Sequence, residues 1–131
     1  MNTMVGNPGT SPDGGTNEFN PNYRQFLKIT QITQPTEIFV FLDEHPDSID
    51  DGAFFNQPET VTGWINLPAS YHNNSGVFSF ADGSCSLHRW READTLRPVE
   101  LISIIGGPAI PVPTGATSDF DWVTEHMSTK N

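Results

Sequence analysis

Two alternating segments joined by Asp82-Gly83 constrain the fold of this chain more than any other feature. Small and aliphatic residues alternate with phenylalanines from residue 76 to the turn, as in a strand with two different faces. A second alternating run covers residues 84–90. Because Asp and Gly tolerate a positive φ, they favour a two-residue turn between the runs. The sequence therefore predicts a β-hairpin over roughly residues 76–90.

The remaining pattern predicts further strands, little helix and long loops. Residues 37–43 are β-branched, aromatic and largely apolar, which is typical of a central strand, and residues 99–105 predict another strand. Residues 119–126 predict one or two helical turns, with Asp119 or Asp121 as the cap. The 11 Gly and 11 Pro also favour strands and loops over a helical bundle.

The length of 131 residues is that of one domain. Residues 1–18 are rich in turn-forming residues and lack apolar periodicity, so we expect a flexible or extended N-terminal arm. Residues 19–131 then form a globular, β-rich domain. There is no run of about 20 apolar residues, so the sequence predicts no membrane span.

The charge of the chain argues against nucleic acid as a partner. Lys plus Arg number 6 and Asp plus Glu number 16, which gives a formal net charge of −10. Such a surface repels phosphate backbones and suits divalent cations better. Cys85 is the single cysteine, so no internal disulfide can form. The cysteine content therefore does not distinguish an oxidising from a reducing compartment.

The loop after the predicted central strand is the candidate metal site. Hard cations such as Ca²⁺ prefer several oxygen ligands, and a loop lets carboxylates and carbonyls converge. The spacing is not that of an EF-hand, because Phe54 stands where a bidentate Glu belongs. The alternative is a solvated loop whose carboxylates accept bonds from backbone N–H groups. The expected Ca²⁺ ligands are Asp43, Asp47, Asp50 and Asp51.

His72 and Asp82 raise the question of an acid–base pair. On one straight strand they are on the order of 25–30 Å apart, so we expect each side chain to interact with a different partner. We expect His72 to bond within its loop and Asp82 to satisfy its own turn. A hydrolase that uses His72, with Asp43 or Asp82 supplied by another segment, is an alternative. The tryptophans could bury in the core or form a platform for a glycan.

Four segments, in this order, resemble the globular part of the prepilin-like (pseudopilin-like) proteins that carry the H-x9-DG motif. They are residues 38–52, residues 67–73 with His72, residues 80–84 with Asp82-Gly83, and residues 119–123. The resemblance covers roughly residues 20–126.

The resemblance implies a pilin-like α+β fold, an antiparallel β-sheet with long loops and little helix. The apolar N-terminal helix of the family is absent from this chain. It further implies a non-enzymatic, extracytoplasmic subunit that associates with itself or with other pilin-like subunits, in filaments related to type IV pili or type II secretion. Some related pseudopilins bind Ca²⁺ in a loop of the sheet. The alternative function is a Ca²⁺-dependent binding module, with glycans as candidate ligands.

Overall fold

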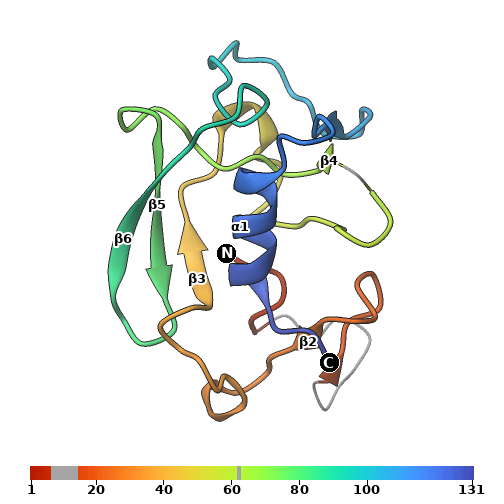
Figure 1. The fold of residues 1–131 in the computed structure, drawn as a ribbon, viewed down its shortest axis with the longest axis vertical. Helices are drawn as coiled ribbons and strands as arrows, with labels where there is room; N and C mark the ends of the chain where they lie inside the picture. Colours follow the sequence, from red (N-terminus) through yellow and green to blue (C-terminus); the bar gives the residue numbers. More distant parts are fainter. Residues whose placement is uncertain (7–14, 62) are drawn as a thin grey trace.

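The computed structural model describes residues 1–6, 15–61 and 63–131 and shows a small α+β domain (Figure 1). It is mostly sheet, with one short helix, and every sheet is antiparallel. The largest sheet has three strands in the order β3-β5-β6, which are Phe39–Leu42, Ser75–Phe80 and Cys85–Arg89. The predicted hairpin is confirmed, and so is a strand within residues 37–43, which lies at 39–42. Its predicted place at the centre of the sheet is wrong, because β5 lies between β3 and β6 and Phe41 of β3 is exposed.

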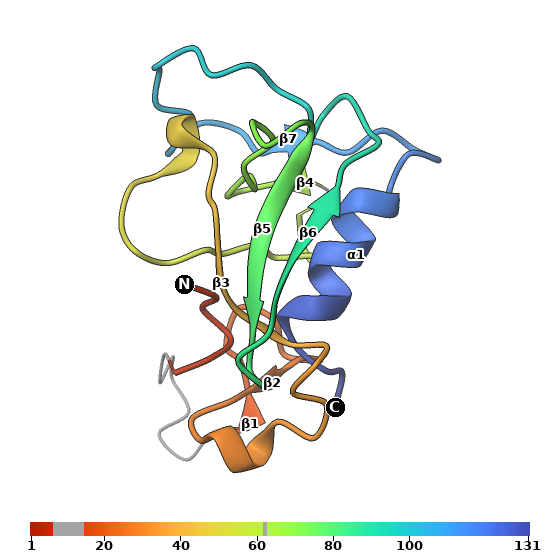
Figure 2. The ribbon, with the colours of Figure 1, turned by 90° about the vertical axis from the view of Figure 1, so that its left-hand side faces the viewer.

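Shorter elements surround this sheet (Figure 2). Two strand pairs and two 3-10 turns connect the long loops, and the helix α1 lies across one face of the three-stranded sheet (Figures 1 and 2). The pairs are β1 (Gly15–Thr16) with β2 (Arg24–Gln25) and β4 (Gly63–Trp64) with β7 (Ile110–Pro111); the turns are η1 (Ile29–Gln31) and η2 (Pro46–Ser48); α1 is Ser118–Met127.

The hairpin turn has three residues, Ala81, Asp82 and Gly83, instead of the predicted two. The Phe80 N–H donates to the Ser84 carbonyl at 2.8 Å, and the Gly83 N–H donates back to the Phe80 carbonyl at 3.0 Å. Gly83 has φ of +89°, which a side chain rarely adopts. The Asp82 carboxylate accepts the Ser84 N–H at 2.9 Å, which fixes the turn. The predicted role of Asp82 in its own turn is therefore confirmed.

The core lies between the sheet and α1. Phe39 of β3 and Phe78 of β5 are fully buried, with ring centroids 5.2 Å apart in an edge-to-face arrangement. Trp122 of α1 packs on Phe78 at 5.0 Å, which joins the helix to the sheet. The predicted helix is thus confirmed, with one more residue at each end.

The predicted helix cap is different. Neither Asp119 nor Asp121 is the N-cap residue, because the helix follows Thr117. The Glu92 carboxylate instead accepts the Asp119 N–H at 3.2 Å. In return, the Asp119 carboxylate accepts the N–H groups of Arg91 and Glu92, both at 2.9 Å. These reciprocal bonds fasten the end of the hairpin to the start of α1.

The strand predicted at residues 99–105 is wrong. This segment is irregular, and its backbone N–H groups do not enter a sheet ladder. Those of Glu100 and Leu101 donate to the Asp47 carboxylate, and that of Ile104 donates to the Asp47 carbonyl. Leu101 has φ of 60°, which no strand allows.

The predicted arm does not extend to the first six residues, which are part of the domain. The Asn2 amide donates to the carbonyls of Phe39 and Met127, both at 2.8 Å, and Met4 is in the core. Residues 15 and 16 form β1. The rest of the predicted arm, residues 7–14, lies outside the described residues. Within the described part of the chain, no helix is long and apolar enough to cross a membrane.

Replacing Asn2 with Ala tests whether the N-terminal residues support the fold. The change removes three hydrogen bonds, because Asn2 Oδ1 also accepts the Met4 N–H at 2.9 Å, and it leaves two buried carbonyls without that donor. We therefore expect a loss of about 2 kcal/mol in the free energy of unfolding. Urea denaturation measures it. The control is Asn131→Ala, an exposed amide that should change stability by less than about 0.5 kcal/mol. Equal stability of the two variants would contradict the structural role of Asn2.

Candidate functional site: an apolar patch beside a cavity

The turn η2 fixes the irregular segment 97–105 through two buried side chains, His45 and Asp47. The Asp47 carboxylate accepts the N–H groups of Glu100 and Leu101, each at 2.9 Å. His45 Nδ1 accepts the Asp47 N–H at 3.2 Å, so Nε2 carries the proton of the neutral ring and donates to the Arg97 carbonyl at 3.2 Å. Arg97, Glu100 and Leu101 are therefore attached to residues 45–47, in addition to the bond from the Ile104 N–H to the Asp47 carbonyl.

The charge of Asp47 is stabilised by the N–H groups around it. The Glu100 N–H has the largest effect and the Leu101 N–H adds to it, so that the pKa of the Asp47 carboxyl lies below its ordinary value, although burial opposes the shift. Hydrogen bonds to an ionised acceptor are stronger than those between neutral groups. The carboxylate therefore persists through the neutral range and keeps the segment in place there.

The attached segment presents aliphatic side chains to solvent. Leu101 is 86% exposed on a left-handed backbone, and Ile102 is 54% exposed. Single exposed aliphatic residues need no explanation, but several on two joined segments are typical of an interaction site. We call this group the apolar patch: Ile49, Val99, Leu101 and Ile102.

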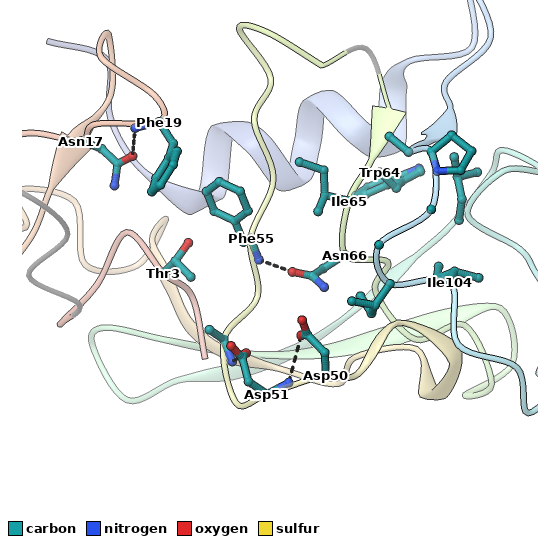
Figure 3. A pocket seen from close by; sticks show the side chains of 17 residues that line it. Thr3, Asn17, Phe19, Asp50, Asp51, Phe55, Trp64, Ile65, Asn66 and Ile104 are labelled. Atoms are coloured by element: carbon teal, nitrogen blue, oxygen red, sulfur yellow. Dashed lines mark hydrogen bonds between the residues drawn. The ribbon is translucent and has the colours of Figure 1, made fainter.

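A cavity of about 390 Å³ lies next to the apolar patch, lined in part by residues 104–110, which follow Ile102 in the chain (Figure 3). One wall is the chain from Ile104 to Ile110, and the opposite wall includes Phe19 and Phe55, whose rings meet edge to face at 5.4 Å. Trp64 lies in the wall between them. The carboxylates of Asp50 and Asp51 also line the cavity.

The four predicted Ca²⁺ ligands have different partners. Asp43 Oδ2 lies 3.1 Å from His72 Nε2, and Asp47 accepts the two N–H groups described above. Asp50 accepts the Asp51 N–H at 2.9 Å, and Asp51 accepts the Ala53 N–H at 2.6 Å. Across residues 1–6, 15–61 and 63–131, no three His, Cys, Asp or Glu side chains are grouped as a metal site. The Ca²⁺ site stays a prediction.

Glu44 is the titratable residue that the sequence did not single out. Burial, with smaller contributions from Asp50 and Asp51, raises its pKa to about 7, while the Ser48 hydroxyl donates to it at 3.1 Å and opposes the shift. An acidic run in a sequence does not show which member is buried. The signal available was Ser48, four residues on, at a spacing that lets the hydroxyl reach the carboxylate.

His72 and Asp82 do have separate partners, as predicted, but the expectation that His72 bonds within its own loop is wrong, because its partner comes from the segment after β3. His72 pairs with Asp43 on the surface, where both side chains are at least one-third exposed. Neither His72 nor Asp43 lines any of the described cavities. His72 thus meets Asp43, one of the two acids that the hydrolase alternative named, in an exposed contact outside those cavities, and an exposed contact of this kind adds at most about 1 kcal/mol to stability.

Two of the three tryptophans serve the core. Trp64 and Trp90 are buried, and their indole N–H groups donate to Asp94 at 2.9 Å and to the Ala69 carbonyl at 2.8 Å. Trp122 is partly buried between the rings of His88 and His126. The burial alternative is therefore confirmed for Trp64 and Trp90, and these two do not form an exposed glycan platform.

Comparison with protein-family models, with curated proteins and with solved structures finds no significant match to this chain. The resemblance to the H-x9-DG proteins therefore stays a prediction. The geometry of the patch, the cavity and the loop is the remaining guide to function.

Glu44 makes stability depend on pH in a definite direction. Its folded pKa of about 7 lies above the ordinary value of 4.5, so the unfolded chain loses the proton first. The contribution of Glu44 to stability is fully present below pH about 4 and is lost as the pH rises to about 7. Glu44→Gln keeps the acceptor for Ser48 and should remove this fall. Because solvent screens a partly exposed carboxyl, we expect a gain on the order of 2 kcal/mol at pH 8, less than the full shift would give.

Thermal unfolding at pH 4, 6 and 8 measures this effect, with Glu18→Gln, an exposed carboxyl, as the control. The control should keep the pH dependence of the unchanged chain. A Glu44→Gln variant with that same pH dependence would mean that Glu44 is solvated.

Proposed function

We propose that this chain is a non-enzymatic structural subunit that acts by self-association, as a pilin-like or pseudopilin-like protein of an extracytoplasmic filament. The observation that carries the self-association is the apolar patch, with Leu101 almost fully exposed on a segment fixed by Asp47. A contact surface that is already ordered loses less conformational entropy when a partner binds.

The overall charge gives this association a definite dependence on salt. Each copy carries a formal charge of −10, so two copies repel at low ionic strength. Salt screens this repulsion, with a Debye length of about 10 Å at 0.1 M. Contact between apolar patches therefore strengthens as salt is added, whereas docking to a basic partner would weaken.

The filament part of the proposal rests on two observations. Four sequence segments resemble those of the H-x9-DG proteins in the same order, and the domain has the antiparallel, β-rich architecture expected of that family. An extracytoplasmic location is inferred from the same resemblance. Leu101 and its neighbours supply a contact that does not depend on an N-terminal helix.

Analytical ultracentrifugation of the whole chain at 50 and 500 mM NaCl tests the proposal. We expect concentration-dependent association that is stronger at the higher salt, and a shift to monomer, roughly tenfold weaker association or more, in Leu101→Asn. Asn removes the aliphatic group without changing the charge and tolerates the left-handed backbone.

The matched control is Ile29→Asn, because Ile29 is 62% exposed on η1, away from the patch. This variant should associate like the unchanged chain. A chain that remains monomeric at both salt concentrations, or a Leu101→Asn variant that associates normally, would overturn the proposal.

The alternative is a Ca²⁺-dependent binding module. Asp50 and Asp51 both raise the pKa of Glu44, so the three carboxyls share one electrostatic environment that a cation would relieve. Isothermal calorimetry with CaCl₂ tests it, with MgCl₂ as the control. The alternative predicts heat and a higher melting temperature with Ca²⁺, both reduced in the Asp50→Asn, Asp51→Asn double variant; the absence of both effects would remove it.

A further inference from the structure

The cavity beside the apolar patch combines aromatic walls with negative charge. Phe19 and Phe55 contribute rings, Ile65 and Ile110 contribute aliphatic surface, and the buried Trp64 lies behind them in the wall. Among the described residues of the lining, the charged groups are the carboxylates of Asp50 and Asp51, and none is Lys, Arg or His. Such a lining repels anions and favours an apolar group that carries a positive charge.

The carboxylates are positioned by their own backbone. Asp50 Oδ1 accepts the Asp51 N–H, and Asp51 Oδ1 accepts the Ala53 N–H. Each carboxylate thus has a second oxygen with capacity for a further donor. Figure 3 shows the Asp50 side chain directed toward Asn66, on the cavity side of its loop.

The side chain of Asn66, toward which Asp50 points in this view, is hydrogen-bonded through both its oxygen and its nitrogen. Asn66 Oδ1 accepts the Phe55 N–H at 2.7 Å, and its Nδ2 donates to the Ser48 carbonyl at 3.2 Å. Asn66 therefore orders the cavity wall. The groups available to interact with a charged ligand are therefore the carboxylates and the faces of the aromatic rings, both of which attract cations.

We propose that this cavity binds a small organic cation, an amine or quaternary ammonium with an apolar body about the size of a phenyl group and a short alkyl chain. The volume of about 390 Å³ is within the range of ligand sites, about 300–1,000 Å³. It exceeds the roughly 150 Å³ that accommodates benzene in an apolar cavity, which leaves room for an ammonium group at the carboxylates.

A bare metal ion fits this cavity less well than an organic cation. Hard cations need six or more oxygen ligands, and most of this lining is apolar. A neutral apolar molecule would use the rings but leave the two carboxylates unused. The charge and the aromatic surface are both satisfied only by a ligand that carries both features.

The test uses three probes of the same shape: 2-phenylethylammonium, 2-phenylethanol and 3-phenylpropionate. Titration of the ¹⁵N-labelled chain in phosphate buffer, followed by NMR, should show binding of the ammonium probe with Kd on the order of 0.1–1 mM. The alcohol should bind at least about threefold more weakly, and the carboxylate should not bind measurably.

Variants then locate the site. Asp50→Asn with Asp51→Asn should weaken the ammonium probe about tenfold, and Phe19→Leu should weaken it about threefold. Asp82→Asn, an exposed carboxylate in the hairpin turn, is the control and should leave Kd unchanged. Shifted resonances should cluster at residues 50–55, 64–66 and 104–110.

No binding of the ammonium probe at 10 mM, equal binding of the three probes, or an unchanged Kd in the Asp50, Asp51 double variant would each overturn the proposal. Measuring the same titration in Leu101→Asn separates it from self-association. Cation binding that persists in this variant shows that the cavity acts independently of the apolar patch.

Discussion

The apolar patch and the cavity of this domain both depend on the hydrogen bonds that Asp47 accepts from the segment 100–104. Its bonds to the N–H groups of Glu100 and Leu101, with the carbonyl bond to Ile104, fix the segment that carries the apolar patch. The same segment continues from Ile104 into the cavity wall. One buried residue on a short 3-10 turn, through its carboxylate and its carbonyl, therefore positions both the apolar patch and the start of the cavity wall.

The sheet and the helix supply a rigid base for that turn. The Asp43 N–H, just beyond β3, bonds to Val77 of β5, and two residues later the His45 N–H bonds to the Leu67 carbonyl. The chain thus enters η2 with its direction already set by β3 and by these two bonds. Because these bonds restrict the backbone of residues 43–47, the side chains of His45 and Asp47 are held where they bond to the segment 97–105.

Local patterns predicted what local physics controls. Alternation predicted the hairpin, and a largely apolar, β-branched run predicted the strand β3, although not its place at the edge of the sheet. Acidic cap candidates followed by Trp122 predicted α1. The run at 99–105 has the β-branched composition of a strand, but its N–H groups bond to Asp47, more than 50 residues earlier. Likewise, turn-forming residues near the N-terminus indicated an arm, whereas Asn2 bonds across the core to Met127. Long-range partners of this kind leave no periodic signal in a sequence.

For the acidic loop, the hydrogen bonds of the carboxylates could be predicted from the sequence, but their position beside a cavity could not. That carboxylates in such a loop accept backbone N–H bonds follows from their chemistry, and Asp47, Asp50 and Asp51 all do so. Which of them would also face a cavity could not be predicted, because the opposite wall comes from residues 104–110. In the proposed function, the negative surface and the exposed patch act together. Repulsion between copies limits indiscriminate contact, so only the fixed, apolar patch offers enough attraction to bring two subunits together.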